Sequence, residues 1–297
     1  MFFETAQIYA NPYLLFFTAF IISTFTSMGG VSGAFLILPF QMSILGYTAP
    51  SVSATNQFYN VIAIPSGVYR YWREKRMIWS LAFFISLATL PGIFIGAYIR
   101  VSFLPDPTLF KFFAGLVLFY IGSKLSKDIW QTKGQPLKSG NKNAVTVVKT
   151  VSFKEISYDY DATVYHISTM ALSLVCFTVG IVGGTYGIGG GAIIAPILVS
   201  FFKLPVHSIA SSALFATFTT SVFGVAFYQS LASFYNLPNV APDFKLGFFL
   251  GLGGIAGMYL GARLQKFFPA HIIKIMLASF ITFIALSYIW NFIKAFL

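Results

Sequence analysis

Charged residues are scarce in this chain, and acidic residues are the scarcest of them. Only 8 residues are Asp or Glu and 19 are Lys or Arg, so 9% of the 297 residues are charged, against roughly 25% in a soluble domain. Hydrophobic residues make up 57%, and the mean hydropathy is +0.78. This composition excludes a soluble globular protein. The long apolar runs predict an all-α polytopic membrane protein rather than the short alternating segments of a membrane barrel.

The apolar runs contain no carboxylate. All eight acidic residues lie in loops or at the ends of runs: Glu4, Glu74, Asp106, Asp128, Glu155, Asp159, Asp161 and Asp243. This absence argues against a buried cation site and against the usual relay of protons through Asp or Glu. The three histidines stand at run ends and form neither a metal cluster with cysteine nor a hydrolytic set with Ser and Asp. We therefore expect no metal, no cofactor and no enzymatic activity.

Cysteine occurs once, as Cys176 in an apolar run, which excludes an internal disulfide framework. A packed thiol is the ordinary interpretation of Cys176, and a role in relaying sulfur is the alternative. Basic residues are absent before Arg70, so the chain lacks the positive start of a secretory signal. We expect the first apolar run to remain in the mature protein.

Ten apolar runs fall into two sets of five, separated by a polar stretch. We expect a first membrane repeat over 1–123, a cytoplasmic polar linker over 124–165 and a second membrane repeat over 166–297. The linker holds seven lysines. Part of it, 144–153, alternates enough to form a strand, but the stretch has too little core for a folded subdomain. The second run of each set, 34–46 and 192–202, is short. A helix of this length spans about 20 Å of the ~30 Å hydrocarbon core.

The two sets of runs repeat one another in register. A shift of 157 superimposes six pairs without a gap: Gly30 and Gly187, Gly33 and Gly190, Pro39 and Pro196, Ser51 and Ser208, Gly67 and Gly224, Tyr71 and Tyr228. A shift of 165 then places Gly92 on Gly257 and Gly96 on Gly261, so the second repeat carries an insertion around 236–243. A constant register over about forty residues indicates an internal repeat.

Lysine and arginine are distributed unevenly between the loops, which predicts the orientation. If every run crosses the membrane and the loop 70–76 is cytoplasmic, 15 of the 19 basic residues lie inside and both termini lie outside. The two five-segment repeats are then inverted relative to each other, as in many transporters. If 34–46 and 192–202 only re-enter, the halves are parallel and the split falls to 13 against 6. We favour inverted repeats, about ten segments in the cell membrane, and attribute the net charge of +11 to cytoplasmic loops rather than to nucleic-acid binding.

Six glycines stand within nine residues at 183–191, between two apolar runs. Each glycine weakens a helix by about 1 kcal/mol, and a broken helix inside a bilayer is tolerated only where protein or a cavity covers its backbone. The equivalent stretch of the first repeat, 29–34, is less rich in glycine. The free N–H groups and the helix dipole at such a break favour an anion.

These features predict a substrate site formed by both short, broken helices and by the polar helix starts that follow them. Its candidate residues are Gly30, Ser32, Gly33, Thr55, Asn56 and Gln57 in the first repeat, and Gly187, Gly189, Gly190, Gly191, Ser211, Ser212 and Thr217 in the second. The alternative is that these small residues only permit close helix packing. We adopt that alternative for the G-x-x-x-G pairs Gly92–Gly96 and Gly257–Gly261.

The order of these motifs resembles the TauE/SafE sulfite-exporter family. The motifs are a Gly-rich break and a short helix in each half, Ser/Thr-rich helix starts, the loop 69–72 (Tyr-Arg-Tyr-Trp) and the motif 96–98 (Gly-Ala-Tyr). Residues 187–191 match the G-x-G-G-G pattern of that family, whereas the first half has Ser32 and Ala34 in place of glycine. The resemblance covers nearly the whole chain apart from 124–165. It implies transport, often outward, of sulfur-containing anions such as sulfite, thiosulfate, sulfoacetate and related organosulfonates.

Physics and resemblance together predict a secondary transporter, an exporter of small sulfur oxyanions or organosulfonates that works by alternating access at a midplane site between the repeats. A small-anion channel or uniporter, which needs no occluded state, is one alternative. A non-transport membrane assembly factor is another, although scaffolding does not need paired glycine breaks. The partners expected are the substrate and the lipid bilayer. Proton coupling, the direction of transport, the particular anion and the oligomeric state stay open at this point.

Overall fold

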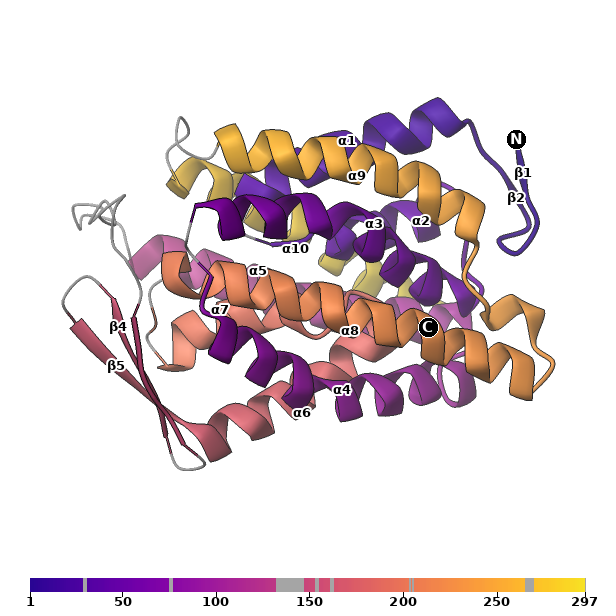
Figure 1. Cartoon of the computed structure of the whole chain (residues 1–297). Coiled ribbons are helices and arrows are strands. Elements are labelled where there is room, and N and C mark those ends of the chain that lie inside the picture. The colour runs from indigo at the N-terminus through magenta and orange to yellow at the C-terminus, as the bar shows by residue number, and fades with distance from the viewer. Residues whose placement is uncertain are drawn as a thin grey trace.

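The computed structural model describes residues 1–28, 31–74, 77–131, 147–152, 155–160, 163–202, 204, 206–264 and 270–296, and it is a bundle of helices (Figure 1). The first half contains β1 (Phe2–Phe3), β2 (Ile8–Tyr9), α1 (Pro12–Met28), α2 (Ala34–Ser43), α3 (Ser51–Arg73), α4 (Trp79–Ser102) and α5 (Pro107–Gln131). Three strands follow: β3 (Val147–Val151), β4 (Glu155–Tyr160) and β5 (Thr163–Ser168). The second half contains α6 (Thr169–Tyr186), α7 (Gly191–Phe202), α8 (Val206–Phe234), the 3-10 turn η1 (Pro238–Val240), α9 (Phe244–Leu264) and α10 (Ala270–Phe296).

Two of these helices begin at aspartate caps. Asp106 Oδ1 accepts hydrogen bonds from the N–H groups of Thr108 and Leu109 at the start of α5, and Asp243 Oδ1 accepts one from Leu246 N at the start of α9. Each cap satisfies N–H groups that have no partner within their own helix. The acidic residues at these run ends therefore fix where the helices start.

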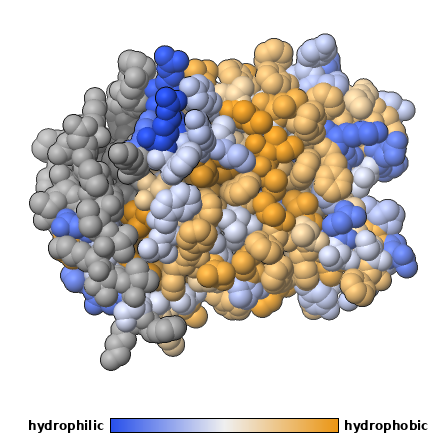
Figure 2. Space-filling model, viewed as in Figure 1, coloured by the Kyte–Doolittle hydropathy of each residue, from blue (hydrophilic) through white to orange (hydrophobic). Residues whose placement is uncertain are grey.

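An apolar band crosses the middle of the molecule on the face seen in Figure 2. Figure 2 shows hydrophobic residues over the central part and hydrophilic residues toward the ends. In the part of the chain that the structure describes, four segments are long and apolar enough to cross a membrane: Trp79–Ser102, Thr169–Tyr186, Ile209–Phe234 and Pro238–Leu264. Helix α3 is of similar length, but the polar residues of its first half, which lower its hydropathy, are buried inside the bundle: Ser51, Ser53, Thr55, Asn56, Gln57 and Asn60. The chain is a helical multi-pass membrane protein.

Helices of one half pack mainly against helices of the other half (Figure 1). Helix α1 lies along α9, α4 lies along α6, and α5 lies along α10. Helix α3 also packs on α9, and α8 also packs on α4. Two mixed bundles result, which we call bundle A (α1, α3 and α9) and bundle B (α4, α6 and α8). They meet where α3 packs against α8.

Glycines bring the backbones of bundle B into direct contact. A Cβ added to Gly92 of α4 would collide with the carbonyl oxygen of Phe177 on α6, and one added to Gly96 would collide with that of Ile181. No side chain fits between these helices, so the prediction that the G-x-x-x-G pair serves close packing is confirmed here.

Bundle A repeats the same contacts at the related positions. A Cβ added to Gly257 of α9 would collide with the carbonyl oxygen of Phe20 on α1, and one added to Gly261 would collide with that of Thr24. The two glycines differ in number from those of bundle B by 165, and the residues that supply the carbonyl oxygens differ by 157. Both are shifts of the sequence repeat. The packing of the two bundles therefore follows the register of the repeat.

The contact between α3 and α8 also has related halves. The side chain of Gln57 on α3 covers Gly224 of α8, and Leu214 of α8 covers Gly67 of α3. Residues 57 and 214, like residues 67 and 224, differ by 157. The same position in each repeat therefore packs on the same glycine of the other repeat.

Helices α3 and α8 begin at opposite ends of the molecule. Near the start of α3, Thr55 Oγ1 accepts a hydrogen bond from Asp243 N, just before α9, at 2.8 Å. Near the start of α8, Ser212 Oγ donates to Ile78 O, just before α4, at 3.0 Å. Helix α4, about 36 Å long, ends beside Thr48 in the loop before α3. We call the end with β1, β2 and Thr48 the hairpin end, and the end with β3–β5 the sheet end (Figure 1).

The polar stretch 124–165 departs from the expected linker. Helix α5 continues to Gln131, and β3, β4 and β5 form an antiparallel sheet in chain order. Ile156 and Tyr158 alternate along β4, are buried, and lie with the buried Ile167 of β5. The expectation of no folded subdomain was wrong, because a two-residue alternation gives a small sheet one apolar face, which packs without a large core. The strand expected within 144–153 is found as β3.

Candidate functional site

The break between α6 and α7 depends on glycine. Helix α6 ends at Tyr186, and the next residues include Gly187 with φ +85° and Gly189 with φ +76°, a left-handed conformation that favours glycine. The N–H groups of Gly187 and Ile188 both donate to Gly183 O. A Cβ on Gly187 would collide with the backbone of Ser53 on α3. The break therefore presses directly against α3.

The break between α1 and α2 lies beside the same helix. Helix α1 ends at Met28, and Gly30, a predicted site residue, falls outside the described residues. Ser32 Oγ accepts a hydrogen bond from Ala34 N at the start of α2. A Cβ on Gly33 would meet the hydroxyl of Tyr59 on α3 at 2.6 Å. Both breaks thus contact one face of α3.

Two asparagines of α3 join the breaks. Asn56 Nδ2 donates to Ala34 O in the first break at 2.9 Å and to Gly187 O in the second at 3.0 Å. One turn along, Asn60 Nδ2 donates to Ile188 O at 3.0 Å, and Asn60 Oδ1 accepts from the hydroxyl of Ser32. Both asparagine side chains are fully buried. The amides therefore link both breaks through bonds to backbone carbonyls and to one hydroxyl.

Further buried groups extend this network to α2. The hydroxyl of Tyr186, the last residue of α6, donates to Phe35 O on α2 at 2.9 Å. Gln41 Nε2 of α2 donates to Asn56 Oδ1 at 3.3 Å. Tyr186 and Gln41 are fully buried. The end of α6, the short helix α2 and the first half of α3 are thus bonded together inside the bundle.

Helix α8 forms the other wall. Gly190 N, just before α7, donates to Thr220 Oγ1 at 3.0 Å, and Asn60 Nδ2 also donates to Ser221 Oγ at 3.2 Å. Thr217 lies against Gly191 and Gly189. The N–H group of Gly190, one of those expected to meet an anion, is therefore bonded to a threonine in this conformation.

Three polar atoms within this network have no hydrogen-bond partner. They are both polar atoms of the Gln57 side chain and Oε1 of Gln41. Leaving a buried polar group unpaired costs about 1–3 kcal/mol, so such groups in a native structure usually await a ligand or water. Gln57 adjoins Asn56 in the chain and Gln41 bonds to it. These unpaired groups, one in the network and two on the side chain that faces Gly224 of α8, are therefore candidates for contact with water or a polar ligand.

The network is electrically neutral. Among the described residues, Asp243 is the buried carboxylate, and its oxygens accept hydrogen bonds from Ala6 N and Leu246 N at the hairpin end. No group of three or more His, Cys, Asp and Glu that could hold a metal ion occurs in the described part of the chain. The network offers amides, hydroxyls and N–H groups, and these can donate to an anion without competing with a carboxylate.

The structure gathers most, not all, of the predicted site residues. Those that lie at the breaks or against them are Ser32, Gly33, Asn56, Gly187, Gly189, Gly190, Gly191 and Thr217. Gln57 faces Gly224 of α8. Thr55 and Ser212 instead bond to the starts of α9 and α4. Ser211 is buried on α8, beside Ser212.

Sequence reasoning missed several members of the network. Asn60 follows Asn56 by four residues, a spacing that puts both amides on one helix face, and this signal was available. Thr220 and Ser221 gave no such signal, because a hydroxyl in an apolar helix commonly donates a hydrogen bond to the backbone of its own helix. Thr220 also makes such a bond, to Ala216 O.

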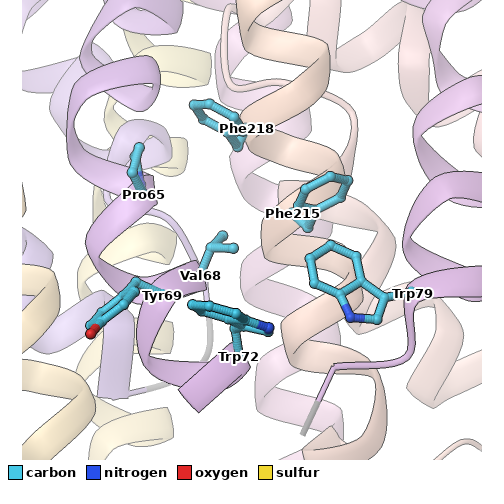
Figure 3. Close-up of a pocket in the computed structure, with 7 residues that line it drawn as sticks. All are labelled: Pro65, Val68, Tyr69, Trp72, Trp79, Phe215 and Phe218. Atoms are coloured by element: carbon cyan, nitrogen blue, oxygen red, sulfur yellow. The ribbon is translucent and has the colours of Figure 1, made fainter. Parts of the chain in front are cut away.

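An aromatic groove opens between α3, α4 and α8 (Figure 3). Its volume is about 430 Å³, and seven residues line it: Pro65, Val68, Tyr69, Trp72, Trp79, Phe215 and Phe218. Trp79 lies near the start of α4, so the groove opens toward the sheet end. Phe218 follows Thr217, which lies against the second break. The groove is therefore an apolar hollow toward the sheet end, lined by α3, α4 and α8.

Comparison with known proteins decides the family. The model of the family described as "Sulfite exporter TauE/SafE" matches residues 15–288 of the chain. The chain belongs to the TauE/SafE family. Its TauE/SafE relatives include a "Probable membrane transporter protein YunE" of Bacillus subtilis, 24% identical over 69% of this chain and 73% of the relative. A "Probable membrane transporter protein" of Methanocaldococcus jannaschii is 24% identical over 90% of this chain and 91% of its own length. No solved structure matches.

Membership of the TauE/SafE family makes the chain a membrane transporter and not an enzyme. The predicted resemblance is thereby confirmed. The network between the two helix breaks is the part of this TauE/SafE chain where buried polar groups concentrate at the centre of the bundle.

Proposed function

We propose that the protein is a secondary transporter that exports small sulfur-containing anions, such as sulfite, thiosulfate or organosulfonates, by alternating access. The observation that carries the proposal is the pair Asn56 and Asn60, whose buried amides join both helix breaks in a network without a carboxylate. Donors without a competing negative charge suit an oxyanion, which offers only acceptor oxygens. The family description names sulfite, and that supports sulfur as the central atom.

The amides of α3 supply the donors. Asn56 Nδ2 and Asn60 Nδ2 now donate to backbone carbonyls, and Gln57 Nε2 donates to nothing. The N–H group of Gly190 at the start of α7 adds the positive end of a short helix dipole. An anion among these four groups replaces the carbonyls as acceptor. Of the predicted hydroxyls, Ser32 and Thr217 lie at the two breaks beside these donors.

Substrate binding releases the two breaks from each other. In the described conformation Asn56 ties Ala34 O of bundle A's connection to Gly187 O of bundle B's connection. When Asn56 turns its amide to the anion, both ties are lost, and the bundles are free to move relative to each other. Substrate and movement are thus linked through the same hydrogen bonds, which alternating access requires.

The repeats are inverted in this proposal. Support comes from α3 and α8, which begin at opposite ends, and from the glycine contacts that recur at shifts of 157 and 165. The moving bodies are bundles A and B rather than the two sequence halves, because each bundle mixes helices of both. We place about ten segments in the cell membrane, with the sheet end in the cytoplasm and both termini outside.

Domain boundaries at 1–123, 124–165 and 166–297 remain part of the proposal, with the middle segment a cytoplasmic connection that holds β3, β4 and the first residues of β5. Protons are candidate coupling ions, carried on the substrate or through a histidine, since the network itself holds no carboxylate.

The test is counterflow in proteoliposomes. Labelled sulfite, thiosulfate and sulfoacetate are offered beside phosphate and chloride, and we expect at least one sulfur anion to show saturable uptake driven by the same unlabelled anion inside. A channel gives no counterflow. Transport of none of the sulfur anions would overturn the substrate class.

Matched variants of α3 localise the site. Asn56→Ala removes the ties to Ala34 O and Gly187 O, and we expect loss of counterflow with normal expression. Ser66→Ala is the control, because its hydroxyl donates to Ala63 O of its own helix and to Ile255 O of α9 and lies outside the network. Unchanged transport by Asn56→Ala would place the site elsewhere.

A further inference from the structure

Arg100 is a buried cation at the end of α4. Its side chain is 0% exposed, and it is the largest fully buried side chain among the described residues. The guanidinium lies 3.7 Å from the ring centre of Phe110 on α5. Its Nη1 donates to Leu104 O, and its Nη2 donates to Thr48 O in a long hydrogen bond of 3.4 Å. Nε has no partner.

One edge of this guanidinium is underused. In arginine, Nε–H and one N–H of Nη2 point the same way and form the fork that binds carboxylate, phosphate or sulfate oxygens in pairs. On Arg100 this edge carries only the long bond to Thr48, while the other nitrogen holds Leu104 O. The capping of its own helix end therefore uses Nη1 and leaves the recognition edge nearly free.

No carboxylate neutralises Arg100 among the described residues. The ion pairs there are Arg70 with Glu74, Lys245 with Glu4 and His166 with Glu155. The buried carboxylate of Asp243 spends its oxygens on backbone N–H groups. A buried charge without an ionic partner is expensive, and the ring of Phe110 and two carbonyls compensate only part of that cost. The remaining positive charge favours an anion.

Arg100 is also connected to the second helix break. The guanidinium lies near the buried side chains of Tyr47 and Tyr228. The hydroxyl of Tyr228 donates to Gly184 O, one turn before Gly187, at 2.9 Å. The hydroxyl of Tyr47 is hydrogen-bonded to the hydroxyl of Thr55 at 2.9 Å, and Thr55 precedes Asn56 on α3. The buried charge therefore stands between the network and the hairpin end.

We propose that Arg100 is a second anion-binding station, which holds the substrate oxyanion by the Nε and Nη2 edge between the central network and the hairpin end. The station rests on the proposed function, because it takes the same substrate. Its ligand class is a small oxyanion with at least two terminal oxygens, such as a sulfite or sulfonate group. Chloride, which cannot use both nitrogens of the fork, binds there more weakly.

The position gives the station a sidedness. Anions that enter or leave at the hairpin end pass Arg100, whereas those at the sheet end meet the aromatic groove first. Removing the guanidinium fork therefore weakens apparent affinity at one face of the membrane and spares the other. A residue that only caps α4 produces no such difference.

The experiment compares Arg100→Gln and Arg100→Lys with the natural protein in right-side-out and inside-out membrane vesicles, using labelled sulfite. We expect Arg100→Gln to raise the half-saturating concentration about tenfold at the face that carries the hairpin end, as for the loss of one charge-assisted hydrogen bond. The other face changes by less than about twofold. Arg100→Lys, which keeps the charge and loses the fork, lies between the two. Arg263→Gln is the control, an exposed arginine in the last turn of α9.

Every outcome of this experiment supports or overturns the anion-binding station at Arg100. Equal loss at both faces, or no change in either variant while the natural protein transports sulfite, overturns the station and leaves the proposed function intact. Absence of sulfite transport by the natural protein overturns the proposed function itself. If Arg100→Gln does not give monodisperse protein, Arg100→Lys alone decides. A raised half-saturating concentration at the hairpin face supports the station, and unchanged kinetics with a lower melting temperature identifies a helix cap and overturns it.

Discussion

The amide of Gln57 lies directly over Gly224, and neither of its polar atoms has a hydrogen-bond partner. At the related positions, the apolar side chain of Leu214 covers Gly67. One side of the contact between α3 and α8 is thus polar and the other is apolar. An unpaired buried amide opposes folding by about 1–3 kcal/mol. That cost, which Leu214 avoids, is offset only if Gln57 binds a ligand, as the proposed function has it.

We expect Gly224→Ala to abolish transport. A Cβ there collides with the amide of Gln57, and the amide has to leave its place over Gly224. The measurement is sulfite counterflow by purified protein that remains monodisperse. Gly67→Ala is the matched control, because its Cβ meets Leu214 Cδ2 at 2.9 Å, the end of a side chain that can turn away. Equal activity of both variants would contradict a ligand role for Gln57.

We expect Asn60→Asp to stop transport and to lower stability. The substitution keeps the shape but removes the donor to Ile188 O and Ser221 Oγ, and it places a negative charge among groups that bind an anion. A carboxylate beside the bound oxyanion repels it, so we expect a loss of at least about tenfold in uptake, or about 1.4 kcal/mol. Labelled sulfite uptake checks this.

The control for the added negative charge is a variant that loses only the hydrogen bonds of Asn60. Asn60→Ala loses the same hydrogen bonds without adding a charge, and we expect it to retain more uptake than Asn60→Asp at the same pH. If the two variants transport equally well, the network does not meet the anion.

We expect Gly96→Ala to destabilise the protein by about 1–3 kcal/mol, the usual effect of overpacking. Its Cβ collides with Ile181 O of α6, and a backbone carbonyl cannot turn away as a side chain can. Gly261→Ala, at the related contact with Thr24 O, should behave in the same way. Thermal unfolding in detergent measures both. A melting temperature unchanged in either variant would show that the helices are less closely packed than described.

Cysteines placed at the two ends test the orientation. We expect Thr163→Cys, at the sheet end, and Asn239→Cys, in the turn before α9, to be labelled by a membrane-impermeant maleimide from opposite faces of the membrane. Both positions are exposed, whereas the natural Cys176 is fully buried and gives little background. Labelling of both from the same face would exclude the inverted arrangement.

Glycine was the most informative residue type in the sequence. Its repeat register predicts both the breaks and the contacts of Gly92, Gly96, Gly257 and Gly261, because a residue without a side chain most readily adopts left-handed turns and lets backbones touch. The bundles themselves could not be read from it. A repeat says which segments are alike, not that α1 lies along α9 instead of α4.

Buried polar residues were harder to assign. Thr55 and Ser212 share the composition of a binding helix start, yet they bond to the starts of α9 and α4. Which side of a helix faces the centre depends on neighbours from the other half. Arg100 ends an apolar run in the sequence, where an exposed charge is expected, and the loop around Thr48 and the ring of Phe110 bury it. The sheet was missed because its core consists of few side chains.

The mixed composition of bundles A and B bears on how such a chain could arise and fold. A single half would leave the backbone faces of Gly92 and Gly96, or of Gly257 and Gly261, with no helix to lie against. A half-length chain would therefore need a second copy of itself to complete either bundle. In the present chain, bundle A is complete only when α9 is present and bundle B only when α6 and α8 are present, so neither bundle can form from the first half alone.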